Sequence, residues 1–207
     1  MLKKTVKYFL WIVAIAFLAY HSIYIKKLSS VKAAEVKAFD GKEYAKNYLD
    51  KKLPDLYANA PEINTLIALL KENPSKAFAD HSNSLNKGDV AYFLVSGEAE
   101  IIKIDDVNVY LKSTTGTGIK LATEYIFGNT IRDASGLISM DEFSNSMDIN
   151  TVSEEINKLI KSQVIPPFKA EAKKGDVVSF KGCIELNQTA LKLDEIEVLP
   201  VYLTIKK

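Results

Sequence analysis

The chain opens with a long apolar run. A short basic segment, MLKKTVK, precedes the apolar residues 8–25, and two lysines follow them. At roughly 1.5 Å per residue such a helix rises about 27 Å, close to the hydrocarbon thickness of a bilayer. No polar face interrupts the run between Tyr8 and Tyr20. We therefore predict an N-terminal transmembrane helix, a signal anchor over residues 1–27 that crosses the cytoplasmic membrane through residues 8–25 with the N-terminus inside.

A cleaved signal peptide is the alternative for this segment. Tyr20, His21 and Tyr24 stand where a cleavage site would need small residues, and the next small pair is Ala33-Ala34. An uncleaved anchor therefore fits the pattern better. In both cases the rest of the chain is expected on the extracytoplasmic, periplasmic side.

Residues 28–86 show the periodicity of amphipathic helices. Asp40, with Glu43 three residues later, is typical of a helix start, and Pro61 suits the first turn of a second helix that ends at Pro74. Residues 75–83 are expected to form a third helix. The apolar stripes of the first two helices are Tyr44, Tyr48, Leu49, Leu53 and Leu56, and Ile63, Leu66, Ile67 and Leu70. We predict a helical subdomain over residues 28–86.

From residue 87 onward, apolar and polar positions alternate. Six segments are predicted to be strands: residues 89–105, 107–114, 118–125, 176–186, 190–198 and 201–206. A helix at 152–164 separates the first three strands from the others. Thr151 and Glu154 form a capping-box pattern at its start, and Pro166-Pro167 is expected to end it.

Two of these strands begin alike. KGDVAYFLVSGEAEI at 87–101 resembles KGDVVSFKGCIEL at 174–186, and each segment carries a glycine within the strand, Gly97 and Gly182. A Gly-Asp turn before a long strand that bends at a glycine is typical of a small curled barrel. The sequence predicts an α+β protein with an OB-like antiparallel β-barrel over residues 87–207, into which helix 152–164 is inserted. Two related β-units are the alternative.

The charge and the cysteine content limit the classes of function. The hydrophobic fraction is 47%, the charged fraction is 26% and the formal net charge is +1, as in a folded globular protein without a basic surface. We therefore expect no nucleic-acid partner. Cys183 is the single cysteine, and His21 and His81 are the histidines, so no Cys/His zinc cluster can form.

The segment RDASGLISMDEF, residues 132–143, partly follows the pattern of an EF-hand calcium loop. Asp133, Gly136 and Glu142 fall at the third, sixth and twelfth positions. The first position would be Ile131, which offers no side-chain oxygen, and no helix leads directly into the loop. We expect no metal site, and we interpret DASG as a tight turn.

No catalytic motif stands out. The sequence contains no Gly-x-Ser-x-Gly elbow and no glycine-rich phosphate or dinucleotide loop. Cys183 lies in a predicted strand, and His81 lies in a polar segment. Acidic pairs suited to glycoside hydrolysis occur at Asp105-Asp106, Asp141-Glu142, and Asp194-Glu195 with Glu197, where turns or exposed strand edges are predicted. We expect a protein that is not an enzyme and that needs no cofactor.

Arg132 is the single arginine among many lysines. Its planar guanidinium is a fork of donors suited to a carboxylate or a phosphate. It serves either a ligand or an internal ion pair that pins the segment before helix 152–164, and the second role is favoured because buried charges are usually paired. Arg132, with its neighbours Asn129 and Asp133, forms the candidate site, as ligand-binding residues or as a structural pin.

Residues 127–168 resemble an uncharacterised bacterial DUF-type family of predicted periplasmic lipoproteins. The matching residues are Gly128-Asn129, Ile131-Arg132-Asp133, Ser135-Gly136-Leu137-Ile138, Phe143, Asn145, Met147-Asp148, Asn150, Glu155-Ile156-Asn157 and Pro166-Pro167-Phe168. The closing GDVVSFKG and LDEIEVLPVYLTI are also similar to the family pattern. The resemblance implies a helical subdomain beside an OB-like domain outside the cytoplasmic membrane. Genes of this family often lie beside sugar ABC-transport components, which implies an accessory role in carbohydrate uptake.

This chain departs from a lipoprotein because no cysteine lies near residue 25, so a transmembrane anchor would replace the lipid. The leading hypothesis is a membrane-anchored extracytoplasmic binding or accessory module. Its partner would be a transport-system protein or a small ligand. The alternatives are a carbohydrate-active hydrolase that uses a carboxylate pair and a purely structural envelope protein.

Overall fold

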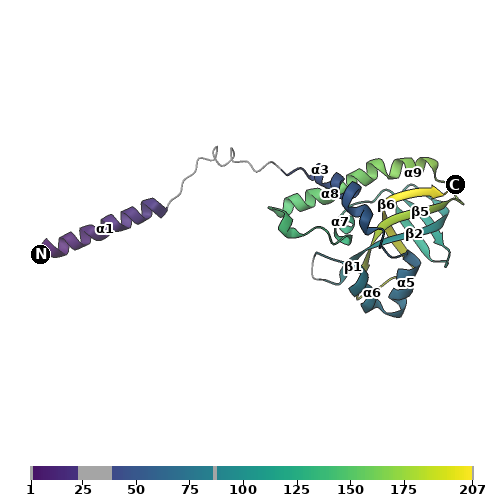
Figure 1. Ribbon diagram of the computed structural model, residues 1–207, viewed down its shortest axis with the longest axis horizontal. Coiled ribbons are helices and arrows are strands. Elements are labelled where there is room, and N and C mark those ends of the chain that lie inside the picture. The colour runs from purple at the N-terminus through teal and green to yellow at the C-terminus, as the bar shows by residue number, and fades with distance from the viewer. Residues whose placement is uncertain (1, 23–38, 86–87, 207) are drawn as a thin grey trace. The chain divides into compact units, whose positions relative to one another are not determined.

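The computed structural model describes residues 2–22, 39–85 and 88–206. The chain divides into two compact units, residues 1–39 and 40–207. Helix α1 (Leu2–Ser22) belongs to the first unit (Figure 1). The second unit contains the barrel and the helices that surround it.

The prediction of a transmembrane helix over residues 8–25 is wrong for the part of the chain that the structure describes. No helix among the described residues is long and apolar enough to cross a membrane. The 21 residues of α1 include Lys3, Lys4 and Lys7, and the part that follows Lys7 is shorter than the about 20 apolar residues that a spanning helix needs. Residues 23–25, the two lysines after them and Ala33-Ala34 lie outside the described residues.

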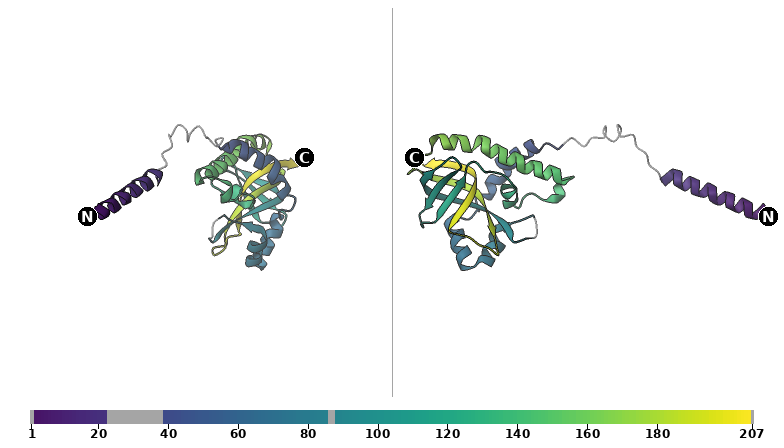
Figure 2. Two further views of the ribbon diagram at one scale, coloured as in Figure 1. Left: turned by 60° about the vertical axis from the view of Figure 1, so that its left-hand side comes forward. Right: turned by 180° about the vertical axis from the view of Figure 1, so that it is seen from behind.

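The strands of the second unit form one curled sheet (Figures 1 and 2). They are β1 (Ser82–Asn83), β2 (Val90–Ile104), β3 (Asn108–Ser113), β4 (Gly118–Ala122), β5 (Val177–Asn187) and β6 (Glu195–Lys206). Their order is β1-β2-β3-β4-β6-β5, and a further pairing of β2 with β5 closes the sheet on itself. The β4–β6 pair is parallel, and the other pairs are antiparallel. Five strands in this arrangement form the barrel of an OB fold, as predicted.

The Gly-Asp-Val residues of the two similar segments, 88–90 and 175–177, lead into the two long strands that close the barrel. β2 and β5 pair antiparallel from Val90↔Asn187 to Glu100↔Val177, so both segments belong to one barrel. Gly97 lies opposite Phe180 in this pairing, and a Cβ atom at Gly97 would lie 2.7 Å from the Phe180 ring. The absence of a side chain at residue 97 therefore leaves the space that the buried ring of Phe180 fills.

Residues 190–206 were predicted as two strands, but the structure has the single strand β6. Pro200 pairs with Gly182 where the β5–β6 register shifts, between Lys181 and Gly182. Proline has no N–H to donate, so a strand tolerates it at such an irregularity. β6 pairs with β4 up to Val198 and with β5 from Leu199, so the strand passes through Pro200 without ending.

Helices cover the barrel in two groups (Figure 2). Before the barrel come α3 (Gly41–Asn47), the π-helical turn η1 (Tyr48–Lys52), α4 (Leu53–Leu56), α5 (Ile63–Glu72) and α6 (Pro74–His81). Between β4 and β5 come α7 (Thr130–Ala134), the 3₁₀ turn η2 (Met140–Glu142), α8 (Ser146–Gln163) and α9 (Ile165–Glu171). Leu66 and Leu70 of α5 pack into the barrel core, whereas α3, α7 and α8 share a second core outside the barrel.

Among the described residues, the helices that precede the barrel contribute side chains to both cores. Tyr48 and Leu53 pack in the second core together with Leu94 of β2 and Cys183 of β5. The described helices from α3 onward therefore belong to the same compact unit as the barrel, residues 40–207.

The starts of α3 and α8 can be compared with the capping patterns predicted from the sequence. Asp40 caps α3 as predicted, since its side chain accepts from the Glu43 N–H at 2.9 Å. The start predicted at residue 152 is wrong because α8 begins at Ser146, where Asn145 accepts from the Asp148 N–H. Thr151 lies inside the helix, and its hydroxyl donates to the Met147 carbonyl at 2.9 Å.

The helix predicted to end before Pro166-Pro167 does end there, since α8 ends at Gln163, but further helical structure follows at once. A second helix, α9, begins at Ile165, and Pro166-Pro167 lies in its first turn. A proline is tolerated there because the first N–H groups of a helix have no partner within the helix.

Candidate functional site

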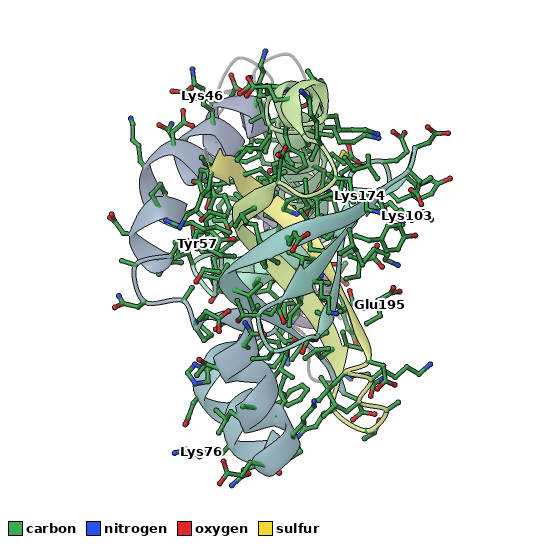
Figure 3. All side chains as sticks on the ribbon, turned by 90° about the vertical axis from the view of Figure 1, so that its right-hand side faces the viewer. Lys46, Tyr57, Lys76, Lys103, Lys174 and Glu195 are labelled. Atoms are coloured by element: carbon green, nitrogen blue, oxygen red, sulfur yellow. The ribbon has the colours of Figure 1, made fainter. Side chains whose placement is uncertain are left out.

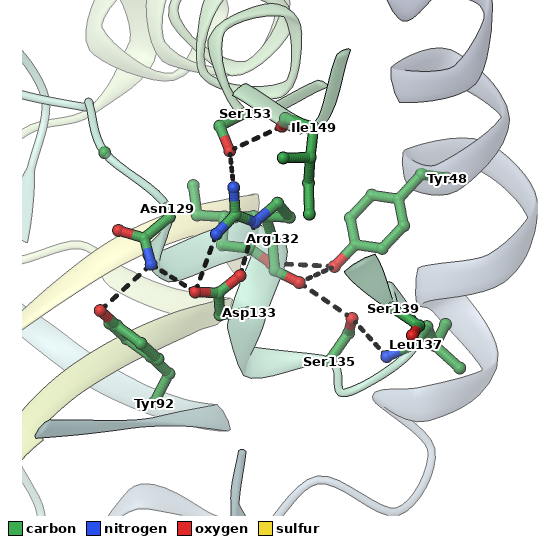
Figure 4. A network of polar contacts seen from close by, with 12 residues as sticks. Tyr48, Tyr92, Asn129, Arg132, Asp133, Ser135, Leu137, Ser139, Ile149 and Ser153 are labelled. Carbon is green, nitrogen blue, oxygen red and sulfur yellow. Dashed lines mark hydrogen bonds and ion pairs between the residues drawn. The ribbon is translucent and has the colours of Figure 1, made fainter. Parts of the chain in front are cut away.

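Arg132 and Asp133 form a buried ion pair on α7. Their residues are 7% and 3% exposed. Arg132 Nε lies 2.5 Å from Asp133 Oδ1, and Nη2 lies 3.0 Å from Oδ2. The remaining terminal nitrogen, Nη1, donates to Ser153 Oγ of α8 at 3.0 Å (Figure 4). The guanidinium plane is thus fixed by two elements, α7 and α8.

Asn129 links this ion pair to the barrel. Its amide donates to Asp133 Oδ2 and to the hydroxyl of Tyr92 on β2, the second bond measuring 3.2 Å (Figure 4). Burial raises the pKa of Tyr92, while the hydrogen bond from Asn129 acts in the opposite direction. The three candidate residues are therefore brought together by the structure, in a network that joins α7, α8 and β2.

Two residues that were not predicted as part of the candidate site hold the backbone of α7. The hydroxyl of Tyr48 donates to the Ile131 carbonyl at 2.8 Å, and the hydroxyl of Ser135 donates to the Arg132 carbonyl at 3.1 Å. Burial raises the pKa of Tyr48 well above its usual range, so the phenol stays a donor. Tyr48 had been placed in an apolar stripe by its spacing, and nothing in that pattern distinguishes a packing ring from one whose hydroxyl has a partner.

A cavity of about 910 Å³ lies against Arg132, between residues 126–132 and α8. This volume is within the range of small-molecule sites. Most of its lining residues carry polar side chains, and the chain atoms of the lining also present apolar surface: Asn129, Arg132, Asn150, Ser153, Glu154, Asn157, Lys158, Lys161 and Ser162, together with Ile126, Phe127 and Gly128. The lining therefore combines amides, hydroxyls and charged groups with one exposed aromatic ring.

Each cation of the cavity lies beside a carboxylate. Arg132 pairs with Asp133, Lys158 Nζ lies 3.2 Å from Glu155 Oε1, and Lys161 Nζ lies 3.7 Å from Glu124 Oε1. Glu154 adds a further carboxylate to the lining. When these partner carboxylates, which lie outside the lining, are counted with Glu154, the surroundings of the cavity have no excess of positive charge.

Donors and acceptors both remain available to a ligand. The guanidinium has five N–H groups, and the bonds to Asp133 and Ser153 use three of them. Asn157 donates through Nδ2 to the Gly128 carbonyl at 2.8 Å, which leaves its side-chain oxygen as an acceptor. The cavity can therefore accept hydrogen bonds as well as donate them.

The residues of the EF-hand-like segment are separated in the structure. Asp133 belongs to the ion pair, whereas Glu142 accepts from the Ser139 N–H at 3.1 Å and from the Tyr44 hydroxyl at 3.0 Å. Within the described ranges, no group of three or more His, Cys, Asp or Glu residues is placed to hold a metal ion.

Cys183 lies away from the cavity, in the second core. It is fully buried, and its Sγ lies 3.6 Å from the hydroxyl of Tyr57, a residue that Figure 3 labels. Burial raises the pKa of Cys183 to about 12, and the hydrogen bond with Tyr57 opposes this rise. The thiol is therefore protonated at neutral pH and has little nucleophilic character.

The carboxylate pairs named from the sequence also lie elsewhere. Asp105 accepts from the N–H groups of Val107 and Asn108, and chiefly the bond from Asn108 lowers the pKa of this partly exposed carboxyl. Glu195 is exposed on the barrel surface (Figure 3). Among the described residues, Glu154 is the carboxylate that lines the cavity.

The fold and the cavity define an α+β protein in which an OB barrel carries a polar site beside an inserted helical segment. The chain matches the model of the family described as "Predicted periplasmic lipoprotein (DUF2291)" over residues 13–204, and it belongs to this family. Membership supports an extracytoplasmic location and confirms the family resemblance seen in residues 127–168.

A solved structure also resembles the chain. It is an OB-fold protein from Thermotoga maritima, 28% identical, with a TM-score of 0.72; the likeness covers 82% of this chain and 100% of that one. The search of curated proteins found no match. These comparisons support the fold and the compartment, and they do not bear on sugar transport.

Proposed function

We propose that the protein is an extracytoplasmic binding module for a small uncharged saccharide, held in the cavity between residues 126–132 and α8. The observation that carries the proposal is that Arg132 lines the cavity although its charge is already paired. Its guanidinium is fixed by Asp133 and Ser153 and has its charge compensated, yet it still lines a cavity of about 910 Å³. A fixed and compensated guanidinium suits an uncharged acceptor such as a sugar hydroxyl or ring oxygen.

The charges of the cavity argue against an anionic ligand. A site for a phosphate or a carboxylate usually presents cations that lack an internal partner. Here Arg132, Lys158 and Lys161 each have a carboxylate within 4 Å, and Glu154 would repel an anion. A ligand without charge avoids this repulsion.

The remaining lining favours a polyhydroxylated ligand. Each sugar hydroxyl donates and accepts, so it is best satisfied by side chains of both kinds. The amides of Asn129, Asn150 and Asn157 provide both, and the hydroxyls of Ser153 and Ser162 do as well. The ring of Phe127, 70% exposed, offers a flat apolar surface beside them.

On this proposal the module acts beside a sugar-uptake system, the context that the family resemblance implies. The chemistry of the cavity supports the ligand class, and family membership supports the compartment. A hydrolase would need two carboxyl groups facing each other at about 5–10 Å, and Glu154 is the one carboxylate that the described lining provides.

Calorimetric titration of the full chain tests the proposal. The ligands are glucose, galactose, mannose, xylose and ribose, with glucuronate and glucose 6-phosphate as charged comparisons. We expect at least one neutral sugar to bind more tightly than both charged ones. Failure of every neutral sugar to bind, or tighter binding of a charged one, would contradict the proposal.

An amide substitution locates the site. Asn150→Ala removes one amide from the lining and should weaken binding about fivefold to tenfold, as expected for one hydrogen bond. Asn59→Ala, at an exposed residue outside the lining, is the matched control and should leave the affinity unchanged. Equal affinities of the two variants would place the ligand elsewhere.

A further inference from the structure

Two exposed aromatic residues, Tyr125 and Phe127, flank the cavity-lining residue Ile126 in the sequence. Phe127 is 70% exposed and Tyr125 is 62% exposed, whereas Ile126 between them is 3% exposed. Among the described residues of the unit 40–207, these are the aromatic residues exposed by more than half. Phe127 lines the cavity and Tyr125 lies just outside its lining.

The residues between and beside the two rings are anchored. Glu124 pairs with Lys161 of α8, Ile126 packs in the second core, and the Gly128 carbonyl accepts from Asn157 of α8. The anchors alternate with the rings along the chain, so every second residue is tied down while Tyr125 and Phe127 project outward. Two large apolar surfaces are thus held in place instead of being buried.

The turn after Phe127 contributes to this arrangement. Gly128 has a φ of +80°, which L side chains rarely adopt, and this conformation is compatible with the bond from Asn157 to its carbonyl. The backbone that carries Phe127 is therefore held by contacts within the protein. A surface held ready in this way loses little conformational entropy on binding.

We infer that the saccharide ligand is at least a disaccharide, with one ring in the cavity against Phe127 and the next ring stacked on Tyr125. This inference rests on the proposed function. A pyranose has a face of C–H bonds and an edge of hydroxyls, so it can place its apolar face on an aromatic ring while its hydroxyls reach the amides. A second aromatic surface beyond the cavity provides a place for a second sugar unit, because the electron-rich ring face attracts the C–H bonds.

The choice of a disaccharide as the ligand depends on the position of Tyr125 beside the cavity-lining residues. Tyr125 alone would be an ordinary exposed aromatic residue. It directly precedes the lining residue Ile126, and the lining combines Phe127 with Asn150 and Asn157, a mixture of apolar and hydrogen-bonding groups within one concave site. An oligosaccharide fits these groups because each sugar unit has both an apolar face and hydroxyl groups.

The test is calorimetric titration of the full chain with three homologous series: glucose, maltose and maltotriose; mannose and α-1,2-mannobiose; xylose, xylobiose and xylotriose. In at least one series we expect the disaccharide to bind about tenfold more tightly than the monosaccharide. Tyr125→Ala should abolish this gain and leave the monosaccharide affinity within about twofold. Phe127→Ala should weaken both ligands.

Tyr110→Ala is the control, since Tyr110 lies on β3 in contact with Lys103 and outside the cavity lining. This variant should retain the gain from the second sugar unit. The inference is overturned if monosaccharides bind but no disaccharide binds more tightly, or if the gain survives in Tyr125→Ala. If no saccharide of any length binds, both the proposed function and the inference fail. If monosaccharides bind without a gain from the second sugar unit, only the inference fails.

Discussion

The interior of the barrel and the helical layer outside it bury very different side chains. Inside the barrel, Phe93, Ile101 and Phe180 are at most 1% exposed and pack against other apolar groups. The layer that contains α7 and α8 buries six polar residues: Thr130, Arg132, Asp133, Ser135, Ser153 and Asn157. The barrel therefore provides a uniform apolar core, and the outer layer fixes polar groups next to a cavity.

The two regions bury different side chains because their backbone groups have different hydrogen-bond partners. The barrel strands satisfy one another through their ladders, so their side chains can all be apolar. The five residues of α7 are too short to satisfy their own carbonyls. Tyr48, Ser135 and Asn83 donate to the carbonyls of residues 131, 132 and 134, and polar side chains are therefore required around this helix.

The largest effect is expected inside the barrel. Phe180→Ala removes a ring that packs on Gly97, and it should lower the free energy of unfolding by about 3–5 kcal/mol. Urea denaturation measures this loss. Val177→Ala, at a residue on the same strand that is 39% exposed, serves as the control and should cost less than about 1 kcal/mol. A similar loss in both variants would show that the barrel core is not the main source of stability.

The second prediction concerns a substitution that breaks the Arg132–Asp133 ion pair of the outer layer. Asp133→Asn leaves the Arg132 guanidinium buried without a counter-charge, and it should cost about 2–4 kcal/mol. The double variant with Arg132→Met should recover part of this loss. Urea denaturation of the four proteins gives a double-mutant cycle, and strictly additive losses would contradict the coupling of the two side chains.

The third prediction has the smallest expected loss in the free energy of unfolding, and it concerns the planar shape of the Arg132 cation. Arg132→Lys keeps the charge but loses the planar fork, so it should cost about 1–2 kcal/mol and lower the melting temperature. Saccharide affinity, measured by calorimetry, should fall as well. An unchanged melting temperature with lost binding would make Arg132 a ligand residue only, and the reverse result would make it a structural residue only.

Much of the fold could be predicted from residue patterns because alternation and turn chemistry are local. The strands that became β2, β3 and β5 follow the alternation closely, and the repeated KGDV segments mark the two strands that close the barrel. The errors arose where a local signal has two meanings. Thr151 resembles a cap but lies inside α8, Pro166-Pro167 starts a helix, and Pro200 lies within a strand.

The candidate site could be predicted only as far as it is contiguous in sequence. Asn129, Arg132 and Asp133 lie within five residues of one another, and the single arginine drew attention to them. Tyr92 and Ser153 come from β2 and α8, and their bonds depend on tertiary packing that no spacing encodes. The cavity itself uses the polar face of α8, which reads in the sequence as an ordinary solvated helix face.

The position of the last strand has a consequence for the order of folding. β6, the final 12-residue strand, lies between β4 and β5, so the barrel cannot be completed before the C-terminal residues are available. Until then β4 lacks a partner on one edge, and the apolar interior stays open to solvent. Such pairings between distant parts of a chain form slowly. The barrel core therefore stays incomplete until residues 195–206 insert between β4 and β5.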